Sequence, residues 1–292
     1  MNLFRGIPYP EEVSVGYWGI QTSTIDWCEE NYVVSSYMAE ALNTVTNAGF
    51  IALAFYAIRD ILANRLEKRF LIASCGFALV GVGSWMFHMT LLYEYQLLDE
   101  LPMIYATCVP YWSIFSFGKT RRGSIMVGIQ VTVAAAVITA VYLYFQDPTI
   151  HQVAYAVLNV LIIIQSYILT TRHVLNQTVM KEMKQIMFLG VATFLVGYML
   201  WNLDIHFCGM WRRLRRMVGM PYGFLLEGHA WWHLFTGLGV YYYIVYLEYL
   251  RVHLLGEHEQ FICIWHFGIF PALRRVGNSN HTVKVEDVSK TQ

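Results

Sequence analysis

Seven long apolar segments determine what a chain of 292 residues like this one can fold into. Each holds about 20 mostly apolar residues, the length of a helix that crosses the hydrocarbon core of a bilayer. Short polar stretches separate them. The segments run from Tyr37 to Ile58, Phe70 to Leu92, Leu97 to Phe117, Ser124 to Phe145, His151 to Thr171, Ile186 to His206 and Gly223 to Tyr246. The pattern predicts an all-α, seven-transmembrane helix bundle that forms a single domain.

The composition also indicates a membrane protein. Charged residues make up 14% of the chain and apolar residues 57%, whereas an ordinary soluble domain has roughly 25% charged residues. Such a chain has too few charges to cover a soluble globule of this size. Basic and acidic residues number 20 each, so no net charge attracts nucleic acid. We expect a membrane-embedded protein without a nucleic acid partner.

The basic residues predict the orientation of the bundle. Fifteen of the 20 Lys and Arg residues fall on the side of the C-terminal tail, and five fall on the other side. Cytosolic loops carry the excess of basic residues. Segment 1–36 is therefore expected in the lumen, residues 37–246 in the seven spans, and tail 247–292 in the cytosol. The glycosylation sequons at Asn176 and Asn280 then face the cytosol, and we expect neither to carry a glycan.

One connection departs from this charge pattern. Arg212, Arg213, Arg215 and Arg216 lie together on the non-cytosolic side. These residues could form an interfacial collar whose long side chains reach toward water. Alternatively, they could bind a lipid phosphate or a substrate head group. The sequence leaves both interpretations open.

Polar side chains within the spans mark a functional site, because each costs about 2.5 to 3.5 kcal/mol at the bilayer centre unless it is paired. These side chains all fall toward the non-cytosolic ends of their spans. They are Ser84, His88, Asp99, Glu100, Asp204, His229 and His233. The chain is therefore predicted to build one polar site near the luminal side.

The histidines indicate a metal site. His229 and His233 are four residues apart and therefore share one face of a helix. This spacing often arises by chance, but His88 supplies a third candidate ligand at the same depth. Three protein ligands with an open fourth position are typical of catalytic zinc. His206 lies near the same end of a span and is a weaker candidate.

Ser84 and Asp99 lie beside these histidines in the pattern. Ser84 precedes His88 by four residues and could hydrogen-bond to an oxyanion. With Gly81 and Gly83 it could instead form a close contact between helices. Asp99 could accept a proton from water, or it could orient a histidine ligand as a neighbouring carboxylate.

Three motifs resemble those of the alkaline ceramidases, a family within the seven-span hydrolases that are similar to the adiponectin receptors. They are Gly81 to Thr90, Gln96 to Tyr105 and His229 to His233, and the stretch from Gly16 to Tyr32 is similar as well. The resemblance extends from Trp18 to about Arg251. The approach Leu225 to His229 is most similar to the fungal phytoceramidase branch.

The resemblance implies zinc bound by His88, His229 and His233, with Ser84 and Asp99 as catalytic residues. It implies cleavage of the amide bond of ceramide, dihydroceramide or phytoceramide to a free fatty acid and a sphingoid base. Fungal members also run the reverse condensation. Asp99 is then expected to move a proton from water to the leaving amine, and Ser84 to bind the developing oxyanion. The family resides in the endoplasmic reticulum or Golgi membrane.

The resemblance also implies a calcium site formed by Asp26, the carbonyl of Trp27, Glu29, Asn31 and Glu40. The residues alone do not identify it, because no EF-hand pattern is present. The spacing of Asp26 and Glu29 equally suits a helix capping box.

The resemblance further pairs Cys28 with Cys208 in a disulfide, on the side where such a bond persists.

Two classes of protein other than an enzyme are considered. A transporter is expected to place its ionisable groups near the membrane midplane, but these cluster at one end. A seven-span receptor or lipid-binding protein with a structural zinc remains the alternative, although it would not require a serine and an aspartate beside three histidines.

Overall fold

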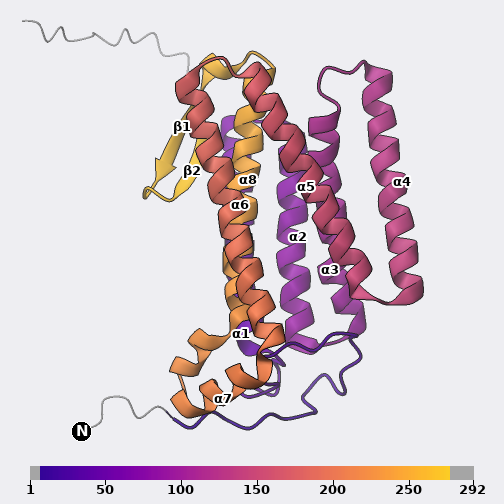
Figure 1. Ribbon diagram of the computed structural model, residues 1–292, viewed down its shortest axis with the longest axis vertical. Coiled ribbons are helices and arrows are strands. Elements are labelled where there is room, and N and C mark those ends of the chain that lie inside the picture. Colours follow the sequence, from indigo (N-terminus) through magenta and orange to yellow (C-terminus); the bar gives the residue numbers. More distant parts are fainter. Residues whose placement is uncertain (1–6, 277–292) are drawn as a thin grey trace, which may run out of the picture.

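The computed structural model describes residues 7–276, so the sequon at Asn280 and the end of the tail lie outside the described residues. Long helices run side by side along the molecule, and a short helix and a hairpin lie at opposite ends (Figure 1). The helices are α1 Ala41–Asn64, α2 Lys68–Thr90, α3 Tyr93–Phe115, α4 Arg121–Phe145, α5 Pro148–His173, α6 Gln177–His206, α7 Cys208–Val218 and α8 Gly228–Leu254. Short 3₁₀ helices span Tyr222–Leu226 (η1) and His258–Gln260 (η2).

Each of the seven expected segments falls largely on one of the long helices. Five of these helices, α1, α2, α4, α5 and α6, are long and apolar enough to cross a membrane by length and composition. Helices α3 and α8 contain 23 and 27 residues and lie in the same bundle. Their acidic, histidine and tyrosine side chains lower their apolar character, so the expectation of seven spans is met in part.

Capping side chains set the start of three helices. The Thr120 side chain accepts a hydrogen bond from the Gly123 amide at the start of α4. Asp147 accepts one from Thr149 at the start of α5, where Pro148 occupies the first turn. Asn176 caps α6 in the same way. Because the first backbone amides of a helix lack partners within it, these caps define where each helix begins.

Glycines allow the central helices to approach closely. A Cβ atom added to Gly239 of α8 would lie 2.8 Å from the carbonyl oxygen of Gly190 on α6. On α2, a Cβ atom at Gly81 would lie 3.0 Å from the side chain of Ile51, and Gly83 faces the main chain of Leu98 on α3. Close helix packing was one interpretation of Gly81 and Gly83 in the sequence, and it explains both of these glycines.

The C-terminal tail is more structured than expected. Helix α8 continues to Leu254, and strands β1 Phe261–His266 and β2 Phe270–Arg275 form an antiparallel hairpin. The Tyr242 hydroxyl donates a hydrogen bond to the Ile269 carbonyl at 3.0 Å. The protein is mostly helical, as expected, and the all-α expectation is corrected only by this two-stranded sheet, which lies against α8.

Candidate metal centre

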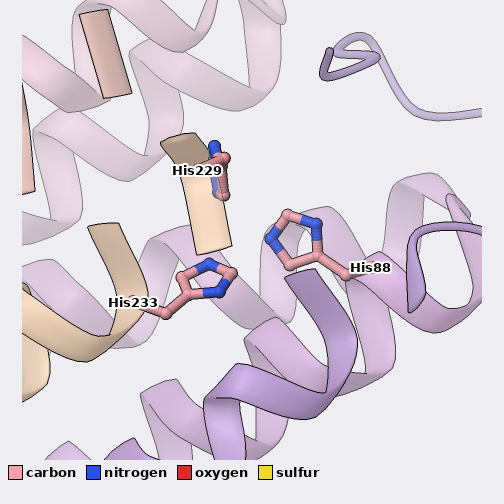
Figure 2. A group of neighbouring side chains, drawn as sticks. All are labelled: His88, His229 and His233. Atoms are coloured by element: carbon pink, nitrogen blue, oxygen red, sulfur yellow. The ribbon is translucent and has the colours of Figure 1, made fainter. Parts of the chain in front are cut away.

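Three histidines from two helices meet at one end of the bundle. His88 lies in the last turn of α2, and His229 and His233 lie in the first two turns of α8. Their ligand atoms all lie within 4.8 Å of one another, and their rings face a common point (Figure 2). The three residues are only 1%, 4% and 4% exposed. The sequence-based prediction that these histidines lie together is therefore met in the structure.

This donor set suits a metal ion. Buried nitrogens normally have hydrogen-bond partners, yet Nδ1 of His229 has none within the protein. Neutral imidazole nitrogens are good ligands for zinc and similar ions. Within residues 7–276, these histidines are the one group of three or more His, Cys, Asp or Glu residues spaced to hold a metal.

Side chains of α1 and the residue before it orient two of the histidines. Glu40 Oε2 lies 2.5 Å from Nδ1 of His88, and Thr46 Oγ1 lies 3.0 Å from Nδ1 of His233. Each contact leaves the other ring nitrogen of that histidine for a metal. Such outer contacts fix the tautomer and the orientation of a ligand. Sequence reasoning missed Thr46, although Asn43, Thr46 and Asn47 are a run of polar residues in an otherwise apolar helix.

Ser84 and Asp99, the two residues expected to be catalytic, lie near one another on α2 and α3. Ser84 is 4% exposed and lies one turn before His88. Its hydroxyl lies near the carboxylate of Asp99 on α3. Glu100, the next residue, instead accepts a hydrogen bond from Tyr142 of α4. The two neighbouring acidic side chains therefore face different helices, Asp99 toward α2 and Glu100 toward α4.

Asp204 positions the helix that carries two of the histidines. It is 1% exposed, and its Oδ1 accepts a hydrogen bond from the Gly228 amide at 3.2 Å. A Cβ atom at Gly228 would lie 2.7 Å from the Leu200 carbonyl oxygen. A carboxylate at a helix N-terminus stabilises that end. His206, the weaker candidate, is exposed, bonds to the Asn202 carbonyl and lies outside the histidine group.

A sequence model of the family described as Ceramidase matches residues 19–274. The chain belongs to the ceramidase family. Alkaline ceramidase YPC1 of Saccharomyces cerevisiae is 45% identical over 94% of this chain and 90% of its own length. Alkaline ceramidase 3 of Mus musculus is 39% identical over 88% and 94%, and the alkaline ceramidase of Arabidopsis thaliana is 32% identical over 82% and 88%. The resemblance inferred from the motifs is confirmed.

In this member of the ceramidase family, the acidic N-terminal residues are linked to the histidine centre through Glu40 and Trp27. Asp26 Oδ1 accepts a hydrogen bond from Asn31 at 3.2 Å, and Glu40 Oε1 accepts one from the Trp27 amide at 3.1 Å. The indole of Trp27 packs 4.5 Å from the ring of His229, centroid to centroid. Two of the five residues considered for calcium, Trp27 and Glu40, therefore contact the histidines.

Glu29 caps the start of α1, not a helix that begins at Asp26 as the capping-box spacing suggested. Its two oxygens accept hydrogen bonds from the amides of Leu42 and Asn43 at 2.7 and 2.8 Å, in the first turn of α1. Burial, followed by the charge of Glu40, raises the pKa of the Glu29 carboxyl. Burial also raises the pKa of Asp26. A cation near these groups would offset the cost of holding them ionised.

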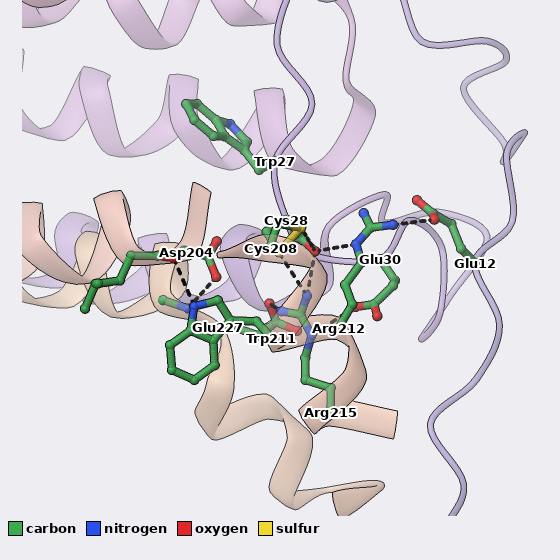
Figure 3. The surroundings of a disulfide bond; sticks show 12 residues. Glu12, Trp27, Cys28, Glu30, Asp204, Cys208, Trp211, Arg212, Arg215 and Glu227 are labelled. Carbon is green, nitrogen blue, oxygen red and sulfur yellow. Dashed lines mark hydrogen bonds and ion pairs between the residues drawn. A yellow bond between two sulfur atoms is a disulfide. The ribbon is translucent and has the colours of Figure 1, made fainter. Parts of the chain in front are cut away.

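A disulfide joins Cys28 of the N-terminal segment to Cys208 of α7 (Figure 3). The fully buried Arg215 pairs with Glu227 and Glu30, and donates a hydrogen bond to the Cys28 carbonyl at 2.6 Å. Arg212 donates to the same carbonyl at 3.0 Å. Neither interpretation of the arginine cluster therefore holds for Arg212 and Arg215.

The spacing of these residues explains the result. Cys208, Arg212 and Arg215 share one face of α7, whereas Arg213 and Arg216 are exposed. No helix was predicted over these residues from the sequence, and the arginines were considered only as a cluster of charge. An amphipathic helix over these residues would have been the signal.

Proposed function

We propose that this ceramidase-family protein is a zinc-dependent amidohydrolase that cleaves the amide bond of ceramide, dihydroceramide or phytoceramide. The products are a free fatty acid and a sphingoid base, and the same groups can serve the reverse condensation. The observation that carries the proposal is the buried group of three histidines, with Ser84 one helical turn before His88 and Asp99 near Ser84 on α3. The names of the relatives support the choice of substrate class.

The protein's own residues fit zinc. His88, His229 and His233 would hold the ion, because they offer three buried neutral nitrogens and an open fourth position. The chemistry that such a zinc supplies is polarisation of the amide carbonyl and a lowered pKa of water, to about 7.

Asp99 and Ser84 carry the proton transfer and the charge. Asp99 accepts a proton from water while the water oxygen attacks the amide carbon. The C–N bond then breaks. Asp99 returns this proton to the leaving nitrogen, so the amine departs neutral. While Asp99 is ionised, the single Ser84 hydroxyl can donate to its carboxylate. Once Asp99 holds the proton, the same hydroxyl donates to the oxyanion that develops on the amide oxygen.

We further propose that α3 and α8 cross the membrane with the five apolar helices, which makes seven spans. The excess of Lys and Arg on the side of the C-terminal tail supports a luminal N-terminus and a cytosolic C-terminus. A disulfide at the opposite end supports the same orientation. An endoplasmic reticulum or Golgi membrane fits both observations.

Calcium is proposed to bind Asp26, the Trp27 carbonyl, Glu29, Asn31 and Glu40. Their proximity at the start of α1 and the contact of Glu40 with His88 support a calcium site coupled to the metal centre. The test is a calcium titration of ceramide hydrolysis by wild type and Asp26→Ala. A weaker calcium response is expected in the variant, and an unchanged response would contradict the site.

The deciding experiment for the function is metal analysis of the purified protein combined with fatty-acid release from ceramide. Wild type is expected to hold zinc and release fatty acid, whereas His229→Ala loses both. His253→Ala, at the far end of α8, is the matched control and keeps both. Stoichiometric zinc without hydrolysis of any ceramide would favour the receptor or lipid-binding alternative.

A further inference from the structure

A cavity of about 240 Å³ lies at the end of the bundle opposite to the histidines. The turn between α1 and α2, the end of α8 and the two strands of the hairpin border it. Five apolar side chains form one part of its wall, and three arginines form another part: Arg65, Arg251 and Arg275. The proposed hydrolysis uses none of these residues. The cavity is therefore a candidate for a second ligand site.

Positive charge exceeds negative charge around this cavity. The Glu67 carboxylate lies between two guanidinium groups, and accepts hydrogen bonds from Nε of Arg251 and Nε of Arg69, both at 2.6 Å. Glu257 is the other acidic residue of the wall. The remaining two arginines of the wall form no ion pair within residues 7–276. Four guanidinium groups thus share two carboxylates, which leaves an excess of two positive charges.

The arginines also keep hydrogen-bond donors that the protein does not use. Arg251 bonds to Glu67 through Nε, and its two terminal nitrogens donate to no residue between 7 and 276. The guanidinium of Arg275 lies over the ring of Phe261, 4.9 Å from its centroid, which holds this group at the wall of the cavity. A guanidinium presents paired N–H donors that match the oxygens of a phosphate or a carboxylate. The wall therefore offers a set of donors for an anion.

The size and charge of the cavity favour a phosphate monoester. Its volume of about 240 Å³ is below the range of about 300 to 1,000 Å³ that is typical of sites for whole drug-sized ligands. It therefore has room for a head group rather than for a whole lipid. A phosphate monoester carries a charge of about −1.5 to −2 near pH 7, which balances the excess of positive charge. Its oxygens can also accept from several guanidinium groups at once, as bidentate pairs.

The position of the cavity indicates a lipid as the carrier of this phosphate. Helix α1 ends at Asn64 and α2 begins at Lys68, so the cavity lies where two apolar helices reach the surface of a membrane. Leu255 belongs to the apolar part of the wall and is 43% exposed. Basic pockets at the cytosolic ends of membrane helices bind anionic lipid head groups. The proposed orientation places this end of the bundle in the cytosol.

We propose that this cavity binds the phosphate monoester head group of an anionic lipid from the cytosolic leaflet. Arg65, Arg251 and Arg275 donate to the phosphate oxygens, and the apolar part of the wall contacts the first atoms of the lipid beyond the head group. Because the site joins the turn after α1 to the end of α8, a bound lipid stabilises the folded protein. The site is separate from the metal centre and does not depend on the ceramide hydrolysis proposed above.

The test titrates the purified full-length protein in detergent with dioleoyl phosphatidic acid. Native mass spectrometry measures the bound lipid, and the melting temperature measures stabilisation. Wild type is expected to bind phosphatidic acid at least tenfold more tightly than dioleoyl phosphatidylcholine, and to melt at a higher temperature with it. Arg65→Gln and Arg275→Gln are each expected to weaken this binding about tenfold or more, because each removes charge-assisted hydrogen bonds.

Arg274→Gln is the matched control. Arg274 is exposed and adjoins Arg275 in β2, but its side chain points to the other face of the strand and does not line the cavity. This variant is expected to bind phosphatidic acid as wild type does. Arg65→Lys keeps the charge and is expected to retain part of the affinity that Arg65→Gln loses. Without lipid, Arg65→Gln should melt close to wild type, because Arg65 has no ion pair within the described part of the chain.

Four results would overturn the site. Equal binding of phosphatidic acid and phosphatidylcholine would exclude a phosphate monoester pocket, and equal weakening in Arg274→Gln would show only diffuse surface charge. Inorganic phosphate that binds as tightly as phosphatidic acid would make the ligand a free phosphate and not a lipid. Oleate that binds as tightly would make it a carboxylate.

Discussion

Each ligand histidine has a different neighbour on its outer side. Glu40 contacts His88, Thr46 contacts His233, and the indole of Trp27 covers His229. Two of these three contacts come from polar atoms that fix the direction of a ring. The positions of the ligand nitrogens therefore depend on α1 and the N-terminal segment as much as on α2 and α8.

Replacement of Thr46 tests this dependence. Thr46→Val removes the hydroxyl beside His233 but keeps the size of the side chain, so zinc affinity is expected to fall about 10- to 100-fold. Competition with a chelator, followed by metal analysis, measures the change. Thr171→Val is the matched control. The hydroxyls of Thr46 and Thr171 each donate to the carbonyl four residues earlier, but Thr171 lies in the last turn of α5 and contacts no histidine of the group. Equal zinc affinity in both variants would show that Thr46 does not orient the ligand.

Ser84 and Asp99 are expected to affect turnover without affecting the metal. Ser84→Ala removes an oxyanion donor and is expected to lower kcat about 100-fold or more. Asp99→Asn prevents proton transfer and lowers kcat by about 100-fold to 10,000-fold. Zinc content and melting temperature should stay near those of wild type. A loss of zinc in Asp99→Asn would instead assign Asp99 to orientation of a histidine ligand.

At the scale of elements, α7 fastens the N-terminal segment over the end of the bundle that holds the histidines. One face of this short helix carries the disulfide and the two arginines that bond to the Cys28 carbonyl. The neighbouring residue Trp27 packs on His229. The contacts of α7 therefore help to keep the segment in place beside the metal centre.

Arg215 is the residue of α7 on which this attachment most depends. Arg215→Met leaves the carboxylates of Glu30 and Glu227 without their buried partner, so the free energy of unfolding is expected to fall by about 3 to 5 kcal/mol. Denaturant unfolding in detergent measures the loss. Arg213→Met, an exposed neighbour on the same helix, should change stability by less than about 0.5 kcal/mol. Similar stability of the two variants would contradict a structural role for the buried ion group.

At the scale of the whole molecule, the histidine site lies at one end of a largely apolar bundle. The histidines, the disulfide and the N-terminal segment lie at the end that also carries α7, and the β-hairpin lies toward the other end (Figure 1). Most of the surface of α4, α5 and α6 is apolar and outward-facing. This division suits an enzyme that meets a lipid within the membrane and carries out hydrolysis at one of its faces.

Glycosylation tests the proposed orientation. Gln21→Asn creates an acceptor sequon with Thr22 and Ser23 in an exposed part of the N-terminal segment. A luminal segment should acquire a glycan there, seen as a gel shift that a glycosidase removes. The native sequon at Asn176, between α5 and α6, should remain unmodified. A glycan at Asn176 with none on the variant would reverse the topology.

The long helices and the His229–His233 pair can be predicted from residue type and short spacing along the sequence. Long apolar segments predict helices because a backbone in lipid must satisfy its own hydrogen bonds. His229 and His233 share a face because they are four residues apart on one helix. Neither the α7 helix nor the hairpin was predicted from the sequence, because such short elements lack the length signal that an apolar span gives.

The sequence by itself determined the apolar helices, the histidine pair and the family, because all of these depend on residue type and short spacing. Only the tertiary structure decided which distant polar groups meet. Glu40 and His88 are 48 positions apart, and Thr46 and His233 are 187 apart. Nothing local selects such partners, since a buried polar atom can be satisfied by many others. The packing of α1 against α2 and α8 makes the selection.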